Sequence, residues 1–233
     1  MAGGVLKRDT MTGRVVRRVL GAKNVAEAVG SIGRGCEIYG LTKGQWSLID
    51  LMEYCLETTG PADVVVSTWT AANADITFAN ALFKNGALRS LRFLVDFSFP
   101  SRQPAYCAAL RAAFGDDAVR LTRNHAKFVL IVNDEWSLVV RTSMNLNENR
   151  RLENFEISDS PEMATFLVEV VDEIFREQGE TFEMRPYDHK QTFLTQWGEK
   201  RVEDADESDP AFDAYFGDGT LDNDLRRTGV SYD

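Results

Sequence analysis

The chain of 233 residues is 44% hydrophobic and 27% charged, the composition of an ordinary soluble globular protein with room for one full α/β domain. Its net charge of −10 argues against a nucleic-acid partner only if the charge is spread evenly. It is not, because residues 203–233 carry ten acidic and two basic side chains, which leaves residues 1–202 with a net charge of −2. A basic groove on the body is therefore permitted.

Membrane insertion and a disulfide framework are both disfavoured by the sequence. No stretch approaches the apolar length needed to span a bilayer, and the N-terminal segment lacks the apolar core of a signal peptide, so we expect a cytoplasmic protein. The three cysteines, Cys36, Cys55 and Cys107, are widely spaced in apolar runs and form no Cys-x-x-Cys pair. This pattern predicts reduced core residues.

Three segments are predicted along the chain. Residues 1–24 form a basic, glycine-containing arm, residues 25–180 an α/β domain, and residues 181–233 a C-terminal extension with an acidic tail from residue 203. The arm is typical of a solvated segment, but its charge also suits contact with a phosphate backbone or a partner subunit. The acidic tail is a candidate to bind a protein partner or to mimic nucleic acid.

Strand and helix patterns alternate within the predicted domain. Helices are predicted from the spacing of apolar residues at 24–32, 47–58, 74–83, 104–114 and 160–175, with Asn73 as the cap of the third helix. Strands are predicted from β-branched and aromatic clusters at 37–41, 63–69, 91–97, 118–122 and 153–158. This alternation predicts an α/β fold with a mixed, largely parallel sheet flanked by helices on both faces.

Residues 125–156 carry the strongest chemical signal. Two apolar runs, residues 128–132 and 136–140, are rich in β-branched side chains and flank the polar residues 133–135. This pattern predicts a β-hairpin with a polar turn. Because an antiparallel hairpin places the start of its first strand beside the end of its second, the residues at these two ends are expected to be neighbours.

Four polar side chains occupy these two ends. His125 and Lys127 precede the first strand, and Ser143 and Asn145 follow the second. An imidazole attacks phosphorus or protonates a leaving oxygen, an ammonium compensates phosphate charge, and a hydroxyl and an amide donate to the non-bridging oxygens. The set predicts phosphoryl-transfer chemistry that requires no metal or other cofactor.

The same residues resemble the signature of the phospholipase D superfamily, in which His-x-Lys is followed by Gly/Ser-Ser-x-Asn. The match is His-Ala-Lys at residues 125–127 and Thr-Ser-Met-Asn at residues 142–145, and an Arg and an Asn-x-Glu follow, as in many members. The resemblance implies a phospholipase D-like fold and assigns roles to seven residues. The catalytic ones are His125, Lys127, Asn145 and Glu156, and the substrate-binding ones are Ser143, Arg150 and Asn154. In the family, the residue matched by Glu156 orients the nucleophilic histidine.

The hairpin departs from the family pattern. The family's Asp falls five residues after the Lys, where this chain has Val132, and the nearest candidate is Asp134. The hairpin is also about three residues longer than usual, which displaces Ser143 and Asn145 together with the residues that follow. We expect the extra residues to be absorbed in the turn or in a bulge, because this keeps the downstream residues on the same face.

The chain carries one signature, whereas the family's mechanism uses two histidines. The second histidine of the chain, His189, lies outside a His-x-Lys motif and is predicted to be a surface residue. The resemblance therefore implies a homodimer in which two copies of His125 share one site, as in the small bacterial endonucleases of the family. One His125 forms a phosphohistidine, and the other protonates the leaving oxygen and then activates water.

The expected function is a metal-independent phosphodiesterase, and the resemblance to single-signature members favours a nuclease acting on DNA or RNA. Two alternatives stay open. One is a nucleic-acid or protein binding module whose catalytic activity has decayed. The other is a phospholipase D-type lipid phosphodiesterase, although the sequence predicts no contact with a membrane.

Overall fold

The computed structural model describes residues 14–18, 22–146 and 151–178. The strands are β1 (Arg14–Arg18), β2 (Glu37–Thr42), β3 (Ala62–Thr68), β4 (Leu88–Asp96), β5 (Val119–Thr122), β6 (Phe128–Val132), β7 (Ser137–Thr142) and β8 (Glu153–Asp159). The helices are α1 (Val25–Val29), α2 (Leu48–Thr59), α3 (Asn73–Lys84), α4 (Phe99–Arg102), α5 (Pro104–Phe114) and α6 (Pro161–Glu177). Two elements, β1 and the short helix α4, have no counterpart in the sequence analysis.

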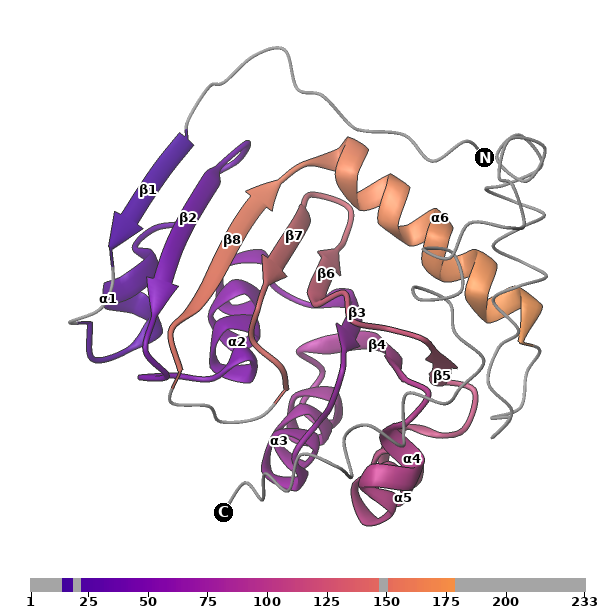
Figure 1. Cartoon of the computed structure of the whole chain (residues 1–233). Helices are drawn as coiled ribbons and strands as arrows, with labels where there is room; N and C mark the ends of the chain where they lie inside the picture. Colours follow the sequence, from indigo (N-terminus) through magenta and orange to yellow (C-terminus); the bar gives the residue numbers. More distant parts are fainter. Residues whose placement is uncertain (1–13, 19–21, 147–150, 179–233) are drawn as a thin grey trace, which may run out of the picture. The chain divides into compact units, whose positions relative to one another are not determined.

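The described strands form a single eight-stranded sheet in the order β1-β2-β8-β7-β6-β3-β4-β5 (Figure 1). The pairs β1–β2, β3–β4 and β4–β5 are parallel, whereas β2–β8, β8–β7, β7–β6 and β6–β3 are antiparallel. The sheet is therefore mixed, and the prediction that it is largely parallel is wrong. Helical crossovers produce the parallel pairs, but the hairpin β6-β7 and the late strand β8 insert as antiparallel neighbours in the middle of the sheet.

Helices cover both faces of the sheet, as the alternation of elements predicted. Val64 and Val66 of β3 belong to a large apolar cluster that includes residues of α1, α2, α3 and α5. Val65, between them, points the other way and belongs to a smaller cluster with Ala164 and Val171 of α6. Figure 1 shows α6 lying across one face and α2 and α3 behind the other. The sheet is thus the middle layer of three.

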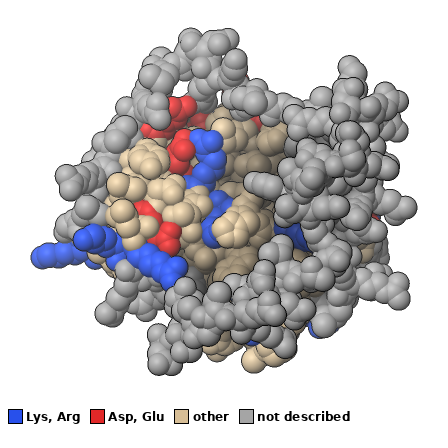
Figure 2. All heavy atoms as spheres, viewed as in Figure 1, with Lys and Arg blue, Asp and Glu red and all other residues tan. Residues whose placement is uncertain are grey.

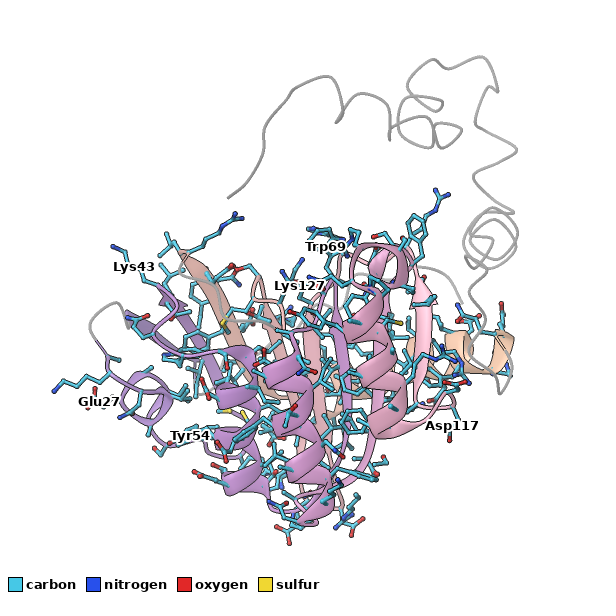
Figure 3. All side chains as sticks on the ribbon, turned by 90° about the horizontal axis from the view of Figure 1, so that it is seen from below. Glu27, Lys43, Tyr54, Trp69, Asp117 and Lys127 are labelled. Carbon is cyan, nitrogen blue, oxygen red and sulfur yellow. The ribbon has the colours of Figure 1, made fainter. Side chains whose placement is uncertain are left out.

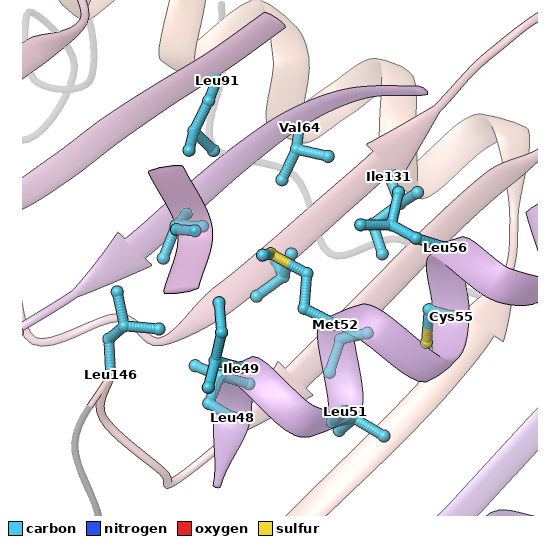
Figure 4. Close-up of a cluster of buried hydrophobic side chains, with 14 of the residues drawn as sticks. Leu48, Ile49, Leu51, Met52, Cys55, Leu56, Val64, Leu91, Ile131 and Leu146 are labelled. Atoms are coloured by element: carbon cyan, nitrogen blue, oxygen red, sulfur yellow. The ribbon is translucent and has the colours of Figure 1, made fainter. Parts of the chain in front are cut away.

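Helix α2 shows how sequence, packing and position are connected. Its buried side chains, including Leu48, Leu51 and Met52, pack against the sheet beside Val64 and Ile131 (Figure 4). Fully burying one such aliphatic side chain contributes about 1.5–3 kcal/mol. The packing of α2 holds the strands below it at fixed positions, and the candidate site is built on the ends of those strands.

Side-chain caps locate some helix starts, but not all of them. Ser47 and Asp50 form a capping box at the start of α2: the Ser47 N–H donates to Asp50 Oδ2 over 2.7 Å, and the Asp50 N–H donates to Ser47 Oγ over 3.3 Å. The prediction that Asn73 caps α3 is wrong, because Asn73 is its first helical residue and Ala72 is the cap. The Ala72 N–H donates to the carbonyl oxygen of Leu146 over 2.8 Å. This bond fixes the position of Ala72, one residue before the predicted cap.

The basic N-terminal segment contains part of the sheet. Residues Arg14–Arg18, placed in a solvated arm by the sequence analysis, form β1 and pair in parallel with Glu37–Leu41 of β2. The predicted arm is therefore corrected to include an edge strand. Residues 1–13 and 19–21 of the predicted arm and the extension 181–233, with His189 and the acidic tail, lie outside the described residues, and the domain boundaries stay a prediction.

Gly40 of β2 has a packing role that its neighbours do not share. It pairs with Phe155 of β8, and the Phe155 ring lies directly over the Gly40 backbone. A Cβ at Gly40 would overlap this ring. The fully buried Phe155 ring also packs edge-on against Trp46, with ring centroids 5.1 Å apart. The absence of a side chain at Gly40 thus allows β8 to lie against β2.

The cysteine prediction is confirmed. Cys36, Cys55 and Cys107 are buried and free, and burial raises the pKa of Cys55 to about 12. Among the helices of the described residues, none has the length and apolarity required to cross a membrane.

Candidate active site

The candidate site lies at one end of the strands and not along an outermost strand. We call this end of the sheet the site edge. Here β2, β3, β4, β5 and β7 end, and the antiparallel strands β6 and β8 begin. Figure 3 shows Lys43, Trp69 and Lys127 together at this edge, whereas Tyr54 and Asp117 lie away from it. The topology therefore gathers residues from widely separated parts of the sequence at one place.

His125 and Lys127 are in direct contact at the site edge. His125 is exposed, and the Nζ of Lys127 lies 3.5 Å from its Nδ1 and donates to its carbonyl oxygen over 3.1 Å. Burial lowers the pKa of Lys127, and the negative charge of Glu153 partly opposes this shift. A cation and a solvent-accessible imidazole thus form one unit.

Asn124 holds this unit in place from below. Its side-chain amide donates to Ser67 Oγ over 2.8 Å and to the Leu94 carbonyl over 3.2 Å, and its Oδ1 accepts from the Ala126 N–H over 2.9 Å. Its own N–H donates to Asp96 Oδ2 over 3.1 Å. A buried side chain therefore ties the His-x-Lys segment to the ends of β3 and β4.

Ser143 lies at the site edge with an unexpected partner, Glu153. The Ser143 hydroxyl donates to Glu153 Oε2, and Ser143 Oγ accepts from the Asn154 N–H over 3.0 Å. The negative charge of Glu153 also acts on Lys127, so this carboxylate interacts with both Ser143 and Lys127. Glu153 opens β8 opposite Thr42, and its position follows from the pairing of β8 with β2.

Asn145 belongs to a segment that docks against the end of β3. The Leu146 N–H donates to Thr68 Oγ1 over 3.2 Å, and the Ala72 N–H donates to the Leu146 carbonyl over 2.8 Å. These bonds bring Asn145 beside the loop that follows β3. Its Oδ1 is buried and has no hydrogen-bond partner within the described residues, which is uncommon for a buried polar atom.

Glu156 lies on the other face of the sheet. Its neighbours Phe155 and Ile157 point into the large cluster under α2, so Glu156 points toward α6, where it forms an ion pair with Arg141. Lys127 and Glu156 line one groove, but the ion-pair partner of Glu156 is Arg141. The resemblance placed Glu156 at His125, whereas in the structure the carboxylate that acts on Lys127 and accepts from Ser143 is Glu153.

Of the other predicted substrate-binding residues, Asn154 lies on the α6 side of β8, because it alternates with Phe155 along the strand. Its backbone is hydrogen-bonded to Ser143. Arg150 lies outside the described residues. A shallow groove with a volume of about 390 Å³ opens here, and its lining residues are Ala126, Lys127, Phe128, Arg141, Thr142, Asn154, Glu156 and Leu167. In the part of the molecule that Figure 2 leaves uncovered, basic and acidic side chains lie near one another.

The longer hairpin retains a regular register. Residues 128–132 of β6 pair with residues 137–141 of β7 without a shift, so the extra length lies in the turn, as expected. Asn133 fastens this turn: its Oδ1 accepts from the Trp136 N–H over 2.8 Å, and its amide donates to the Thr59 carbonyl over 3.0 Å. Asp134 is 93% exposed at the far end from His125, so it does not support the site.

Sequence reasoning missed Asn124, Glu153, Trp69 and Arg102. The Trp69 ring centroid lies 6.5 Å from that of His125, and the Arg102 guanidinium lies 3.7 Å from the Trp69 ring. The available signal was positional: Trp69 directly follows a predicted strand, and Asn124 directly precedes the His-x-Lys motif. Within the described ranges, no three His, Cys, Asp or Glu side chains are grouped to hold a metal ion.

No protein-family model and no curated protein matches this chain. Solved structures that are similar include polyphosphate kinase from Porphyromonas gingivalis, with 10% identity and a TM-score of 0.45 over 59% of this chain and 26% of the kinase. A phospholipase D family member, Nuc from Salmonella typhimurium, has 16% identity and a TM-score of 0.44 over 60% of this chain and 93% of its own. NucT from Helicobacter pylori has 13% identity and a TM-score of 0.44 over 60% and 96%. The chain thus spans about a quarter of the kinase.

Proposed function

We propose that this chain is a phosphodiesterase of the phospholipase D type and that its substrate is a nucleic acid. The observation that carries the proposal is the contact between the exposed imidazole of His125 and the ammonium of Lys127, 3.5 Å apart. A nucleophile beside a cation is the minimal requirement for attack on an anionic phosphodiester, because the cation offsets the negative charge that repels the nucleophile.

In the proposed reaction, a ring nitrogen of His125 attacks phosphorus, and a P–N bond forms while the bond from phosphorus to the leaving oxygen breaks. The His125 of a second chain donates its proton to that oxygen. Water then attacks phosphorus, gives its proton to the second His125, and the P–N bond breaks to release a phosphomonoester. Lys127, Ser143 and Asn145 hold the non-bridging oxygens during both steps.

The proposal requires a homodimer, because each chain contributes one His125 to the shared site. Two features support it. His125 is exposed, so a second copy is able to approach it, and it lies at the site edge just before β6. We assign to Glu153 the role of orienting His125 that the resemblance gave to Glu156, because Glu153 is the carboxylate beside Ser143 and Lys127. Arg150 and Asn154 remain proposed substrate contacts.

A nucleic acid is favoured over a small phosphodiester by the charges at the site edge. Lys43, Arg123 and Lys127 lie next to the ends of the strands that build it, and Arg102 ends the short helix α4 that follows β4. Successive phosphates of a polynucleotide are able to contact several such cations at once. The body of the chain has a net charge of only −2, so these cations are not outweighed by a strongly acidic surface.

The first experiment measures hydrolysis of bis(p-nitrophenyl) phosphate and of labelled DNA and RNA, with and without EDTA. Hydrolysis is expected to persist in EDTA, and His125→Ala is expected to abolish both turnover and a phosphoenzyme trapped under alkaline conditions. His189→Ala is the matched control, because it removes the other histidine of the chain. Full turnover in His125→Ala excludes the mechanism, and binding of nucleic acid without cleavage favours the decayed binding module.

A second experiment tests the shared site. Wild-type and His125→Ala chains are mixed in equal amounts and allowed to exchange subunits. If each site needs two His125 residues, only dimers of two wild-type chains are active, and about a quarter of the activity remains. Independent sites would retain about half. Light scattering on the same samples gives the mass, and a strictly monomeric active protein contradicts the proposal.

A further inference from the structure

A second cluster stands at the site edge next to His125, and the proposed chemistry does not use it. It consists of two pairs in which an arginine lies over an aromatic ring. The Arg102 guanidinium carbon is 3.7 Å from the Trp69 ring centroid, and that of Arg123 is 5.5 Å from the Phe97 ring centroid. We call these four residues the aromatic platform. They come from the ends of β3, β4 and β5 and from α4.

The platform is fixed relative to His125 by hydrogen bonds. Arg102 donates from Nη2 to the Trp69 carbonyl over 3.1 Å and from Nε to Ser98 Oγ over 2.8 Å. The carboxylate of Asp96 accepts from the Ser98 N–H over 3.0 Å and, through its other oxygen, from the Asn124 N–H over 3.1 Å. The network that positions the His-x-Lys segment therefore also positions Arg102.

The second pair is attached to the same strands. The Phe97 N–H donates to the Thr122 carbonyl over 2.9 Å, immediately before Arg123. Trp69 follows β3 directly, and its ring centroid is 6.5 Å from that of His125. The two aromatic side chains thus lie on neighbouring strand ends, on one side of the nucleophile. Their spacing from His125 is set by the sheet and not by a free loop.

Three of the four platform residues are exposed and Trp69 is partly buried, which separates the cluster from ordinary core packing. The Phe97 side chain is 39% exposed, and Arg102 and Arg123 are exposed as well. Single exposed aromatics are common on protein surfaces and need no explanation. Phe78 on α3, which is 37% exposed, is an example. Phe97 and Trp69 differ from it because each is paired with an arginine and both stand beside the proposed nucleophile.

An aromatic ring combined with an arginine suits a nucleic-acid base and its phosphate. Bases stack on aromatic faces and on guanidinium planes, and the cation binds the adjoining phosphate. In a duplex, both faces of each base are already stacked on neighbouring bases, so the duplex presents its backbone and groove edges and leaves aromatic platforms unused. An unpaired strand presents its bases and its phosphates together.

We propose that the aromatic platform of Trp69, Phe97, Arg102 and Arg123 binds unpaired bases of a single-stranded polynucleotide and directs the adjoining phosphate to His125. This inference rests on the proposed function and narrows it, because it names single strands as the substrate class. Trp69 and Phe97 are specificity-determining residues in this arrangement. Arg102 orients the Trp69 ring and contributes its charge.

The test measures binding separately from cleavage. Full-length chains that carry His125→Ala are titrated into a labelled oligothymidylate strand, and into a blunt duplex of the same length, with fluorescence anisotropy as the readout. The strand is expected to bind more tightly than the duplex. Trp69→Ala and Phe97→Ala should each weaken strand binding by about 5- to 150-fold, the range for loss of one stacked base. Trp69→Phe should restore most of the loss.

The controls match the removed groups but lie elsewhere. Phe78→Ala removes an equally exposed phenyl ring from α3, and Arg89→Ala removes an arginine from the opposite end of β4. Both are expected to leave strand binding within about twofold of the parent, whereas Arg102→Ala weakens it about as much as one lost stack. Because Phe97 is exposed, Phe97→Ala tests the platform even if replacement of Trp69 disturbs folding.

The outcomes separate this inference from the proposed function. Strand binding that is unchanged in both Trp69→Ala and Phe97→Ala, or tighter binding of the duplex, overturns the platform even if the parent chain cleaves bis(p-nitrophenyl) phosphate. If the parent chain cleaves no phosphodiester but binds strands in a way that depends on Trp69 and Phe97, the proposed function fails. The platform is then supported as the surface of a single-strand binding module.

Discussion

The Nζ of Lys127 contacts both the Nδ1 and the carbonyl oxygen of His125, at 3.5 Å and 3.1 Å. One ammonium group therefore touches the ring and the backbone of the residue two positions earlier. This double contact makes the orientation of the imidazole depend on the charge and reach of a single side chain.

The pH dependence of activity should report the Lys127 ammonium. Phosphate binding needs the charged form, whose fraction falls as the pH rises through the pKa of Lys127. Because burial lowers this pKa, the alkaline loss of activity should begin below the pH expected for an ordinary lysine. The value of kcat/KM on bis(p-nitrophenyl) phosphate, measured from about pH 6 to about pH 11, gives the position of this limb.

Lys127→Arg is the control for this assignment. A guanidinium stays charged throughout that range, so the variant should lose the alkaline limb even where its activity at neutral pH is lower. The same alkaline limb in the parent and in Lys127→Arg would assign it to another group.

Glu153→Gln should act on the same limb. The Glu153 carboxylate raises the pKa of Lys127, so its neutralisation should move the alkaline limb to still lower pH. It also weakens the acceptor for the Ser143 hydroxyl, and we expect kcat/KM to fall by at least tenfold. The pH profile and the rate are measured on one substrate under the conditions used for the parent.

Glu156→Gln is the matched comparison, three residues along the same strand. Its partner is Arg141, on the α6 side of the sheet, and a partly exposed ion pair contributes about 0–1 kcal/mol. We expect a smaller loss of activity than in Glu153→Gln and no displacement of the alkaline limb. The reverse order of effects would return the orienting role to Glu156.

Asn124→Ala should reduce both stability and activity. The substitution removes the buried amide bonds to Ser67 and Leu94 and the acceptor of the Ala126 N–H, at a cost of about 1–3 kcal/mol in the free energy of unfolding. Activity should fall further than the folded fraction does, because the His-x-Lys segment loses its support. Urea titration and kcat/KM are measured in parallel.

Asn85→Ala provides the reference for that loss. Asn85 accepts one exposed backbone bond, from the Ala87 N–H, at the end of α3. Its replacement should lower the free energy of unfolding by less than about 1 kcal/mol and leave activity unchanged. Equal losses in the two variants would mean that Asn124 has no special role at the site edge.

Gly40→Ala should be strongly destabilising, because the added Cβ overlaps the Phe155 ring between β2 and β8. Overpacking of this kind costs about 1–3 kcal/mol. Gly33→Ala is the control, because a Cβ at Gly33 has no heavy atom within 4 Å, and it should be neutral or slightly stabilising. Urea midpoints that are the same for the two variants would contradict the packing described for β8.

Local signals predicted most of the elements. The apolar spacing of residues 47–58 located α2, and the β-branched runs located β6 and β7. The order of strands in the sheet was not available from such signals. Alternation of strands and helices indicated parallel pairing, but whether β8 joins the sheet at its edge or between β2 and β7 depends on contacts between residues more than a hundred positions apart.

The candidate site shows the same division. His125, Lys127, Ser143 and Asn145 were found from their positions at the ends of one hairpin, because a hairpin is a local structure. The choice between Glu153 and Glu156 was not local. On a strand, two residues three positions apart point to opposite faces, so which glutamate lies near Lys127 is known only when the register of β8 against β7 is known.

The place of β8 in the sheet has a consequence for biosynthesis. It is the last described strand in sequence, yet it lies between β2 and β7 and supplies Glu153. The N-terminal part of a nascent chain leaves the ribosome first, so β2 and β7 remain unpaired on the side that β8 will occupy until residue 159 has left the ribosome. Nascent chains halted before that point should therefore be inactive and prone to aggregate, and enzymatic activity should mark the completion of translation through β8.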